Sequence, residues 1–271
     1  MEDRVSISIA DGIADVRLVR ADKMNALDQA MFEALVAATE RLSREKAVRA
    51  VVLSGEGRAF CAGLDMGRFA AMKEKGGNGV PGGESRDLAK RTHGKANFAQ
   101  QAVWGWRQLP VPVIAAITGV AFGGGFQLAL GADIRLMAPD ARMSIMEIKW
   151  GLVPDMAGTP ILASLVRDDI LRELTYTGRI FSAQEALAYG LATRIVDDPR
   201  AAALEMAREI AAKNPHAIRA AKRMMNNLSV DPGPALLAES VEQQKLIGSP
   251  NQTEAVRANI EKRAPRFAEA G

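Results

Sequence analysis

Two glycine-containing segments organise this sequence: AFCAGLD at residues 59–65 and GVAFGGGFQ at residues 119–127. Each follows a short apolar run, which is typical of a buried strand. Their small residues allow backbone N–H groups to face outward in the turn that follows the strand. Two such N–H groups from separate loops make an oxyanion hole, which stabilises negative charge on a carbonyl oxygen. The sequence therefore predicts that the two segments converge.

The triple glycine at residues 123–125 is also compatible with a phosphate-binding loop. It opens a predicted helix, and a helix N-terminus favours negative charge. However, no Lys-Ser or Lys-Thr pair follows it, and the spacing of a dinucleotide-binding motif is missing. The residues therefore argue against a nucleotide site.

Length and composition restrict the class of protein. The 271 residues suffice for one large domain or for a domain with a helical appendage, and 48% hydrophobic with 25% charged residues is ordinary for a globular chain. A net charge of +3 is too small to indicate nucleic acid, and no apolar run could span a membrane. The single cysteine allows no intrachain disulfide, and the first residues lack the apolar region of a signal peptide, so we expect a cytoplasmic location.

The order of predicted elements indicates an α/β fold. Residues 5–9 and 13–18 alternate apolar and polar side chains around Asp11-Gly12, which predicts a hairpin. Asp28 is a candidate cap for a helix whose apolar stripe is Met31, Leu35, Ala38 and Leu42. Further strands are expected at residues 50–53, 113–117 and 133–137, and further helices at residues 97–109 and from Gly124 onward, while residues 192–196 form a short apolar stretch.

The second half of the chain is predominantly helical from residue 161 onward. Strand–helix repeats followed by helices predict βαβ units with a helical C-terminal part. We place the α/β core at residues 1–197 and the helical region at residues 198–271. The Gly-, Lys- and Glu-rich stretch at residues 73–91 is expected to be a mobile surface loop.

The two segments, combined with Arg20, NAL at residues 25–27 and the stretch from Glu147 to Gly158, resemble the enoyl-CoA hydratase/isomerase (crotonase) superfamily. The resemblance covers nearly the whole chain. It implies a crotonase-like core of four ββα superhelix turns and a helical C-terminal region that mediates trimerisation. It also implies homotrimers or hexamers built as dimers of trimers. The expected substrate is a CoA thioester, with no permanently bound cofactor and no metal.

The same resemblance assigns provisional roles to individual residues. The backbone N–H groups of Ala62 and Gly124 would be the oxyanion donors. The positions that line the CoA site in the family are Met24, Ala26, Leu64, Asp65 and Met66. Trp150 lies between two acids in the sequence and is expected to shape the acyl pocket.

The acidic residues bear on the reaction. Hydratases similar to this chain carry two glutamates that hold and activate one water, but the matching positions here are Gln127 and Glu147. An amide can form hydrogen bonds but cannot act as a carboxylate acid or base. Asp155, eight residues after Glu147, supplies a second carboxylate where hydratases usually have glycine. The two-glutamate mechanism is therefore in doubt.

The pair Glu147 and Asp155 is similar in spacing to that of dienoyl-CoA isomerases, in which two carboxylates pass protons along a diene. Two other relatives also have such features: 3-hydroxyisobutyryl-CoA hydrolases share the spacing, and in 4-chlorobenzoyl-CoA dehalogenases an aspartate at the position of Asp155 is the nucleophile. Dienoyl isomerases usually carry an acid at position 127, the hydrolases are longer and have glycine there, and the dehalogenases need a histidine base and lack the acid at position 147. His93 lies in the right interval for that base, but within the predicted mobile loop.

The sequence thus favours an acyl-CoA isomerase that shifts a double bond through an enolate, with Glu147 as the base. Three alternatives stay open: a hydratase using Glu147 and Asp155, a 3-hydroxyacyl-CoA hydrolase, and an acyl-CoA-binding scaffold without turnover. Structural roles compete with the functional ones. Asp155 could cap a helix, Gln127 could bond only to backbone, and Cys61 is expected to be a packing residue rather than a nucleophile.

Overall fold

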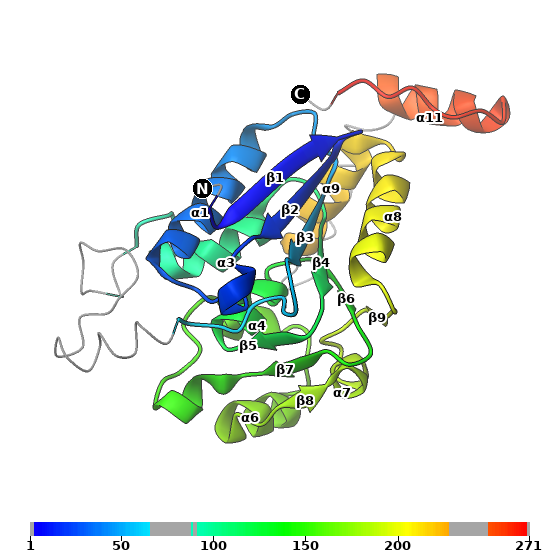
Figure 1. Cartoon of the computed structure of the whole chain (residues 1–271). Helices are drawn as coiled ribbons and strands as arrows, with labels where there is room; N and C mark the ends of the chain where they lie inside the picture. The colour runs from blue at the N-terminus through cyan, green and yellow to red at the C-terminus, as the bar shows by residue number, and fades with distance from the viewer. Residues whose placement is uncertain (1–2, 66–87, 89–90, 228–248, 270–271) are drawn as a thin grey trace.

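A six-stranded sheet forms the centre of the molecule (Figure 1). The computed structural model describes residues 3–65, 88, 91–227 and 249–269. The strand order is β1-β2-β3-β4-β6-β9. Only β1 and β2 pair antiparallel, and every later pair in this sheet is parallel. The strands are β1 (Val5–Ala10), β2 (Ile13–Leu18), β3 (Ala50–Gly55), β4 (Val113–Ile117), β6 (Ile134–Met137) and β9 (Arg194–Ile195).

The predicted hairpin is confirmed. β1 and β2 pair from Val5 opposite Leu18 to Ala10 opposite Ile13. The turn residues Asp11 and Gly12 both have positive φ, at 52° and 75°. That backbone suits a two-residue hairpin turn, because its twist matches the twist of the flanking strands.

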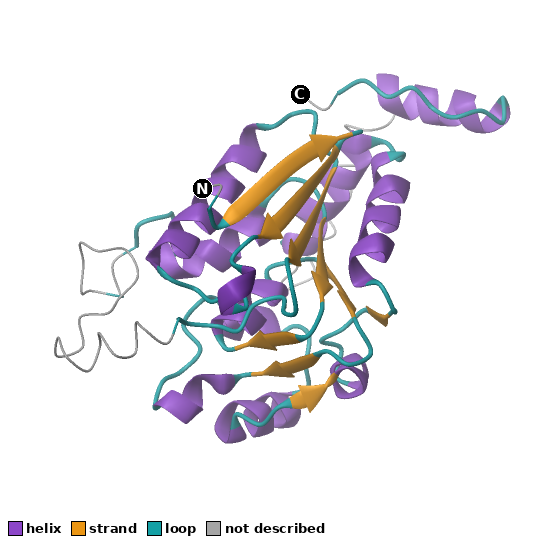
Figure 2. Ribbon diagram, in the orientation of Figure 1, coloured by secondary structure: helices purple, strands orange, loops and turns teal. Residues whose placement is uncertain are grey.

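Helices cover both faces of the large sheet (Figure 2). Successive side chains of a strand point to opposite faces. Val51 and Leu53 accordingly lie in the larger hydrophobic cluster with α1 (Gln29–Arg44) and α3 (Phe98–Gln108). Ala50 and Val52 lie in a second cluster with α8 (Pro199–Ala211). Burial on both faces explains why β3 and β4 are almost continuously apolar.

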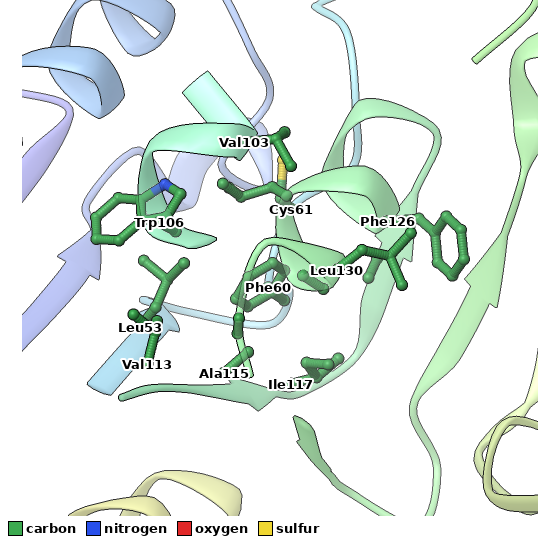
Figure 3. Packing of buried hydrophobic residues seen from close by; sticks show 14 of the residues in the cluster. Leu53, Phe60, Cys61, Val103, Trp106, Val113, Ala115, Ile117, Phe126 and Leu130 are labelled. Atoms are coloured by element: carbon green, nitrogen blue, oxygen red, sulfur yellow. The ribbon is translucent and has the colours of Figure 1, made fainter. Parts of the chain in front are cut away.

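The larger cluster holds the most bulky buried side chains, including Phe60, Trp106 and Phe126 (Figure 3). Trp106 is fully buried and donates from Nε1 to the carbonyl oxygen of Ala102 at 3.0 Å. Cys61 is also fully buried there, and burial raises the pKa of its thiol to about 12. A thiol with that pKa is not a nucleophile near neutral pH, which supports the packing role expected for Cys61.

A second, three-stranded sheet was not predicted from the sequence. It consists of β5 (Val120–Phe122), β7 (Arg142–Ser144) and β8 (Phe181–Ser182), in the order β5-β7-β8. It lies beneath the large sheet in Figure 1, with its strands running crosswise to it. Strands of two or three residues carry too little periodicity to be recognised in a sequence.

Most of the remaining helices lie in the C-terminal part of the chain, which is predicted to be mainly helical from residue 161 onward. They are α4 (Gly124–Leu130), α5 (Gly158–Leu162), α6 (Asp168–Thr177), α7 (Ala183–Ala188), α9 (Pro215–Asn226) and α11 (Pro250–Ile260), with the short 3₁₀ helices η1 (Ala21–Lys23) and η2 (Met146–Trp150). Among the described residues, no helix has the length and apolar character needed to cross a membrane. The division at residue 197 and the trimerisation role of the C-terminal helices remain predictions.

Asn25 joins the start of the chain to the first glycine segment. Its side chain is fully buried, and the backbone has φ 55°, a value that asparagine tolerates better than most residues. Nδ2 donates to the carbonyl oxygens of Glu56 at 3.0 Å and Ala59 at 2.9 Å, and Oδ1 accepts from the N–H of Arg20 at 3.0 Å. One side chain thereby holds the turn that precedes the helix α1 against the end of β3.

We predict that Asn25→Ala lowers the free energy of unfolding by about 1–3 kcal/mol, because buried backbone groups lose their partners. Urea unfolding of the purified variant measures the loss. Asn226→Ala is the matched control: Asn226 is exposed and bonds only the carbonyl of Arg107 among the described residues, so its change should stay within about 0.5 kcal/mol. Equal losses in the two variants would contradict the assigned role of Asn25.

Candidate active site

A cavity of about 1240 Å³ opens beside the start of α4. Most of its wall comes from four parts of the chain: η1 with the residues that follow it, the first glycine segment, the start of α4, and η2 with the loop after it. The lining includes most of the expected site residues, namely Met24, Ala26, Ala62, Leu64, Asp65, Gly124, Gln127, Glu147, Trp150 and Asp155. Met66 lies outside the described residues.

The two glycine segments meet at this cavity, as the sequence predicts. Cys61 pairs with Ala121 as an isolated parallel bridge, and Leu27 pairs with Leu64 in the same way. At Gly63, a Cβ atom would lie 2.5 Å from the carbonyl oxygen of Phe122 and 3.7 Å from the backbone nitrogen of Gly124. Gly63 also has φ 91°, so both the close approach and the backbone conformation require glycine.

The structure corrects one of the two expected donors. The N–H of Ala62 donates to the carbonyl oxygen of Met24 at 2.9 Å, so it is already used inside the protein. In the next residues, the carbonyl of Gly63 and the N–H of Asp65 both bond to Leu27. Extended backbone alternates direction, so the N–H of Leu64 points away from Leu27. Leu64, rather than Ala62, is the residue of this turn with an N–H available to a ligand.

Gly124 offers the other N–H group. It is the first residue of α4, and the first N–H groups of a helix have no acceptor within the helix. Their position also gives them the favourable end of the helix dipole for a negatively charged oxygen. A Cβ at Gly124 would lie within 3 Å of side-chain atoms of Leu27 and Met156. Glycine therefore keeps this donor clear of its own side chain.

The residues expected to line the CoA site are tied together by Arg20. Its guanidinium nitrogen Nη1 lies 2.6 Å from Oδ2 of Asp65 and donates to the carbonyl oxygen of Ala26 at 3.0 Å. Met24 and Asn25 both have positive φ, which turns the backbone sharply between η1 and Ala26. These contacts fix Ala26 and Asp65 beside one another at the cavity wall. Asp65 thus has a structural partner in addition to its place at the cavity.

Glu147 is a buried carboxylate with only one oxygen satisfied. It lies in η2, is 9% exposed, and its Oε1 accepts a hydrogen bond from Gln127 Nε2 at 2.6 Å. Oε2 is buried without a hydrogen-bond partner among the described residues. Burial raises the pKa of Glu147, and the nearby charge of Asp155 raises it further, whereas hydrogen bonds with the Glu147 backbone N–H and Gln127 lower it. A carboxylate with a free oxygen and a raised pKa is suited to taking up a proton.

Gln127 bonds to backbone, as its structural interpretation predicts, and also to Glu147. Its Oε1 accepts from the N–H groups of Met156 at 2.9 Å and Gly158 at 3.0 Å. Gln127 is 1% exposed, so no side of its amide is open to bulk water. Both polar atoms of its amide thus have partners in the protein, and because Gln127 also lines the cavity, its expected contact with substrate stays a prediction.

Asp155 stands in the cavity and does not cap a helix. α5 begins at Gly158, its N-cap is Ala157 with φ 68°, and no side chain caps it. The Asp155 residue keeps more than a third of its surface accessible, which is directed to the cavity that it lines. The surrounding walls displace bulk water and raise the pKa of its carboxyl, against a smaller lowering by its own backbone N–H. The capping interpretation of Asp155 is wrong.

Apolar side chains make up much of the rest of the cavity wall, together with the charged residues Arg20, Asp22, Lys23 and Lys149. Trp150 is 40% exposed, and Leu152 and Val153, which follow it closely in the sequence, are 42% and 70% exposed. The Lys149 ammonium lies 5.4 Å from the centre of the Trp150 ring, where cation and aromatic face attract one another. Among the described residues, no group of three His, Cys, Asp or Glu side chains comes together that could hold a metal ion. The site therefore combines two N–H donors, two acids and an apolar wall.

Two contributors were not recognised in the sequence: the Leu64 N–H and the backbone of Met156 and Gly158. The signal for Leu64 is its place one residue after a glycine that must adopt positive φ. The signal for Gly158 is weaker, because the contact that requires glycine there involves a residue far away in the sequence. A Cβ at Gly158 would lie 2.8 Å from Gln127 Oε1. Such contacts become visible only once α4 and the loop after η2 are placed together.

The raised pKa of Glu147 leads to a prediction about stability. When the pKa of a group is higher in the folded state, the folded protein loses stability as the pH rises from the pKa of the group in the unfolded chain, ordinarily 4.5 for a glutamate, through its pKa in the folded state. Glu147→Gln carries no such charge. We therefore expect Glu147→Gln to be more stable than the unaltered protein at pH 8, with a difference that shrinks as pH falls to 4.

Urea unfolding at both pH values tests this expectation. Glu209→Gln in α8 is the matched control, because Glu209 is exposed and lies outside the cavity lining. It should change the free energy of unfolding by less than about 0.5 kcal/mol at either pH. If the free energy of unfolding of Glu147→Gln differed from that of the unaltered protein by the same amount at both pH values, the surroundings of Glu147 would not disfavour its ionised form.

Comparison with known proteins places this site in a family. The family model described as enoyl-CoA hydratase/isomerase matches residues 8–270. Methylglutaconyl-CoA hydratase, mitochondrial, of Mus musculus is 31% identical over 264 residues, covering 94% of this chain and 79% of that protein. The 1,2-epoxyphenylacetyl-CoA isomerase of Escherichia coli K12 is 30% identical and covers 96% of each.

Solved structures agree in fold over the whole length. An enoyl-CoA hydratase from Bacillus anthracis superposes with a TM-score of 0.86 at 32% identity, covering 97% of this chain and 98% of that one. A putative enoyl-CoA hydratase/isomerase from Mycobacterium abscessus gives 0.88 at 28% identity, covering 98% and 100%. With the family model matching nearly every residue, and with the two glycine segments meeting at one cavity, this chain belongs to the enoyl-CoA hydratase/isomerase family.

Proposed function

We propose that this enzyme shifts a double bond in an enoyl- or dienoyl-CoA, as in the conversion of a 3,5-dienoyl thioester to its 2,4 isomer. The observation that carries the proposal is the direct hydrogen bond of 2.6 Å between Gln127 Nε2 and Glu147 Oε1. The residues at the two positions that carry the hydratase glutamates touch each other, which leaves no place for a water between them. What remains is one base with one free oxygen, which is sufficient for moving a proton.

The thioester oxygen would accept hydrogen bonds from the N–H groups of Leu64 and Gly124. Met24, Ala26 and Asp65 would hold the CoA moiety, and Trp150 would contact the acyl chain. Glu147 Oε2 removes a proton from the acyl chain, and the electrons of that C–H bond move into the conjugated system to give an enolate or dienolate. Either Glu147 returns that proton to another carbon, or a protonated Asp155 donates its own proton there and then takes up the proton that Glu147 holds, so that both acids end in their starting states. No atom is gained or lost, so this step requires neither water nor a redox partner.

Two effects lower the energy barrier of this step: hydrogen bonds to the oxyanion, and proton transfer by a positioned acid or base. Backbone donors fixed around an oxyanion contribute typically about 10²–10³ in rate per donor. Proton transfer by a positioned acid or base contributes typically about 10²–10⁴. The raised pKa of Glu147 supports its role, because it brings the carboxyl closer to the pH at which it must both take and release a proton.

A hydratase is the second candidate, supported by Asp155 and by the relatives. Asp155 lines the same cavity, its pKa is raised, and its charge acts on Glu147. A water held between Asp155 and Glu147 would replace the water of the two-glutamate mechanism. The relatives named above include a hydratase as well as an isomerase.

The oligomeric state and the cellular location of this chain stay predictions. One relative is described as mitochondrial.

The deciding experiment follows the ultraviolet spectrum of a 3,5-dienoyl-CoA during incubation with the purified protein. Growth of the red-shifted band of the conjugated 2,4-dienoyl thioester supports the isomerase. Turnover of a simple enoyl-CoA to a 3-hydroxyacyl product carrying solvent ¹⁸O supports the hydratase instead. Release of free CoA from a 3-hydroxyacyl-CoA indicates a hydrolase. Tight thioester binding without turnover across the whole panel indicates a scaffold.

We predict that Glu147→Gln lowers kcat for the isomerisation by about 10²–10⁴-fold, because the base is lost. The dissociation constant of a CoA thioester should stay unchanged, because the proposed donors Leu64 and Gly124 are backbone groups. Steady-state kinetics and calorimetric titration measure the two quantities. Glu209→Gln serves again as the control and should leave both unaltered, while undiminished turnover by Glu147→Gln would remove Glu147 as the base.

A further inference from the structure

Gln127 connects the two acids of the cavity through a single amide. Its Nε2 donates to Glu147 Oε1, and its Oε1 accepts from the N–H groups of Met156 and Gly158. Met156 directly follows Asp155 in the chain. One end of the amide therefore contacts the base, while the other end anchors the backbone that carries the second acid.

We propose that Gln127 is a positioning residue that selects Oε2 of Glu147 as the proton-transferring oxygen and holds the Asp155 segment in register with it. This inference rests on the proposed function and adds the means by which the site chooses one oxygen of its base. Gln127 contacts protein groups on both sides, so it acts through Glu147 and the Asp155 segment rather than on the substrate.

The orientation of the amide follows from its partners. Two backbone N–H donors converge on one atom, and only the carbonyl oxygen of the amide can accept them. The remaining atom must then be the NH₂ group, which faces Glu147 at 2.6 Å. The side chain cannot flip without leaving two buried N–H groups unsatisfied and placing an oxygen against a carboxylate. Its direction is therefore fixed by the fold.

A glutamate at position 127 could not fill this role in the same way. One of its oxygens would accept from Met156 and Gly158, and the other would then face Glu147 Oε1 as a second negative charge. Two carboxylates at that distance cannot both be ionised, so they would share a proton. Because the two N–H groups stabilise the charge at position 127, the proton would reside mainly on Glu147. The base would be lost until a higher pH.

The unpartnered oxygen of Glu147 supports the selection of Oε2. Oε1 is held by Gln127, whereas Oε2 is buried and has no hydrogen-bond partner among the described residues. A Cβ at Gly123 would lie 3.6 Å from Oε1 and 4.0 Å from Oε2. The carboxylate is therefore adjacent to the glycine that precedes the Gly124 donor, and all three residues line the same cavity.

The charged groups around Glu147 lie on η2, on the loop after it and on α6. Asp155, in the loop after η2, is the charge that acts on its carboxyl. Lys149 in η2 lies over the Trp150 ring, and in α6, which packs on η2, Asp168 pairs with Arg172 and Glu173 with Arg179. α4, which carries Gln127, has no titratable side chain. Gln127 is thus the neutral hydrogen-bond partner of Glu147, and its hydrogen bond acts against the repulsion that the charge of Asp155 exerts on the Glu147 carboxylate.

Two substitutions test the proposal. Gln127→Met keeps the length of the side chain but removes all three hydrogen bonds, and Gln127→Glu keeps the shape but replaces the donor to Glu147. The matched controls are Gln184→Met and Gln184→Glu on the exposed face of α7. The first measurement is the titration of the Glu147 carboxyl by ¹³C NMR of glutamate-labelled protein without substrate, with the Glu147→Gln spectrum assigning the signal.

We expect the pKa of Glu147 to rise in Gln127→Met, because a hydrogen bond that favours its ionised form is lost, and to rise further in Gln127→Glu. The controls should leave it unchanged. An unchanged Glu147 titration in both Gln127 variants overturns the proposal. If Gln127→Met does not fold, the isosteric Gln127→Glu decides the matter alone.

The second measurement is the pH profile of kcat/KM for the dienoyl-CoA isomerisation, which reports the free enzyme as the NMR titration does. Its acidic limb should move to higher pH by the same amount as the NMR titration. On the plateau above that limb, Gln127→Met should still lose about 10²-fold, because the base is no longer aligned. A normal plateau would show that the amide does not position the base. If the NMR titration shifts but the unaltered protein turns over no dienoyl-CoA, the proposed reaction fails while the contact to Glu147 stands.

Discussion

The close approach of two glycine segments is the constraint on which the rest of the site depends. Backbone atoms of Gly63 and Phe122 come so near that any Cβ at position 63 would collide with a carbonyl oxygen. The bridge between Cys61 and Ala121 fixes the register of this approach, and Asn25 holds the first segment against the end of β3. The positions of the Leu64 and Gly124 N–H groups follow from this backbone approach, which the Asn25 side chain supports.

The acidic part of the site depends on a different interaction, in which a neutral amide faces a buried carboxylate. Burying a charge without full compensation is costly, and Glu147 keeps one oxygen unsatisfied. Gln127 offsets part of that cost with a hydrogen bond, but Asp155 adds to it by repulsion. The balance leaves Glu147 less acidic than an exposed glutamate, which is the property that a proton-transferring group needs. Stability and chemistry are therefore opposed at this residue.

Much of the fold could be predicted from local patterns. The hairpin around Asp11 and Gly12, the Asp28 cap, and the strands at β3 and β4 all follow from periodicity and turn chemistry that act over a few residues. The three short strands β5, β7 and β8 were missed because each is two or three residues long and pairs with partners distant in sequence. The family could still be recognised from the order of its motifs, although these strands could not be predicted. The motifs are the two glycine segments that meet at the cavity.

Residue types and their order are enough to indicate the family, most of the candidate site residues at the cavity, and the glutamine that stands at position 127 in place of a second glutamate. The tertiary structure was needed to show which N–H groups are free, since Ala62 and Leu64 differ solely in the direction of an extended backbone. It also decided that Asp155 faces a cavity and that Gln127 points its NH₂ group at Glu147. Those facts arise from contacts between segments 20 to 31 residues apart in the chain, and no local pattern records them.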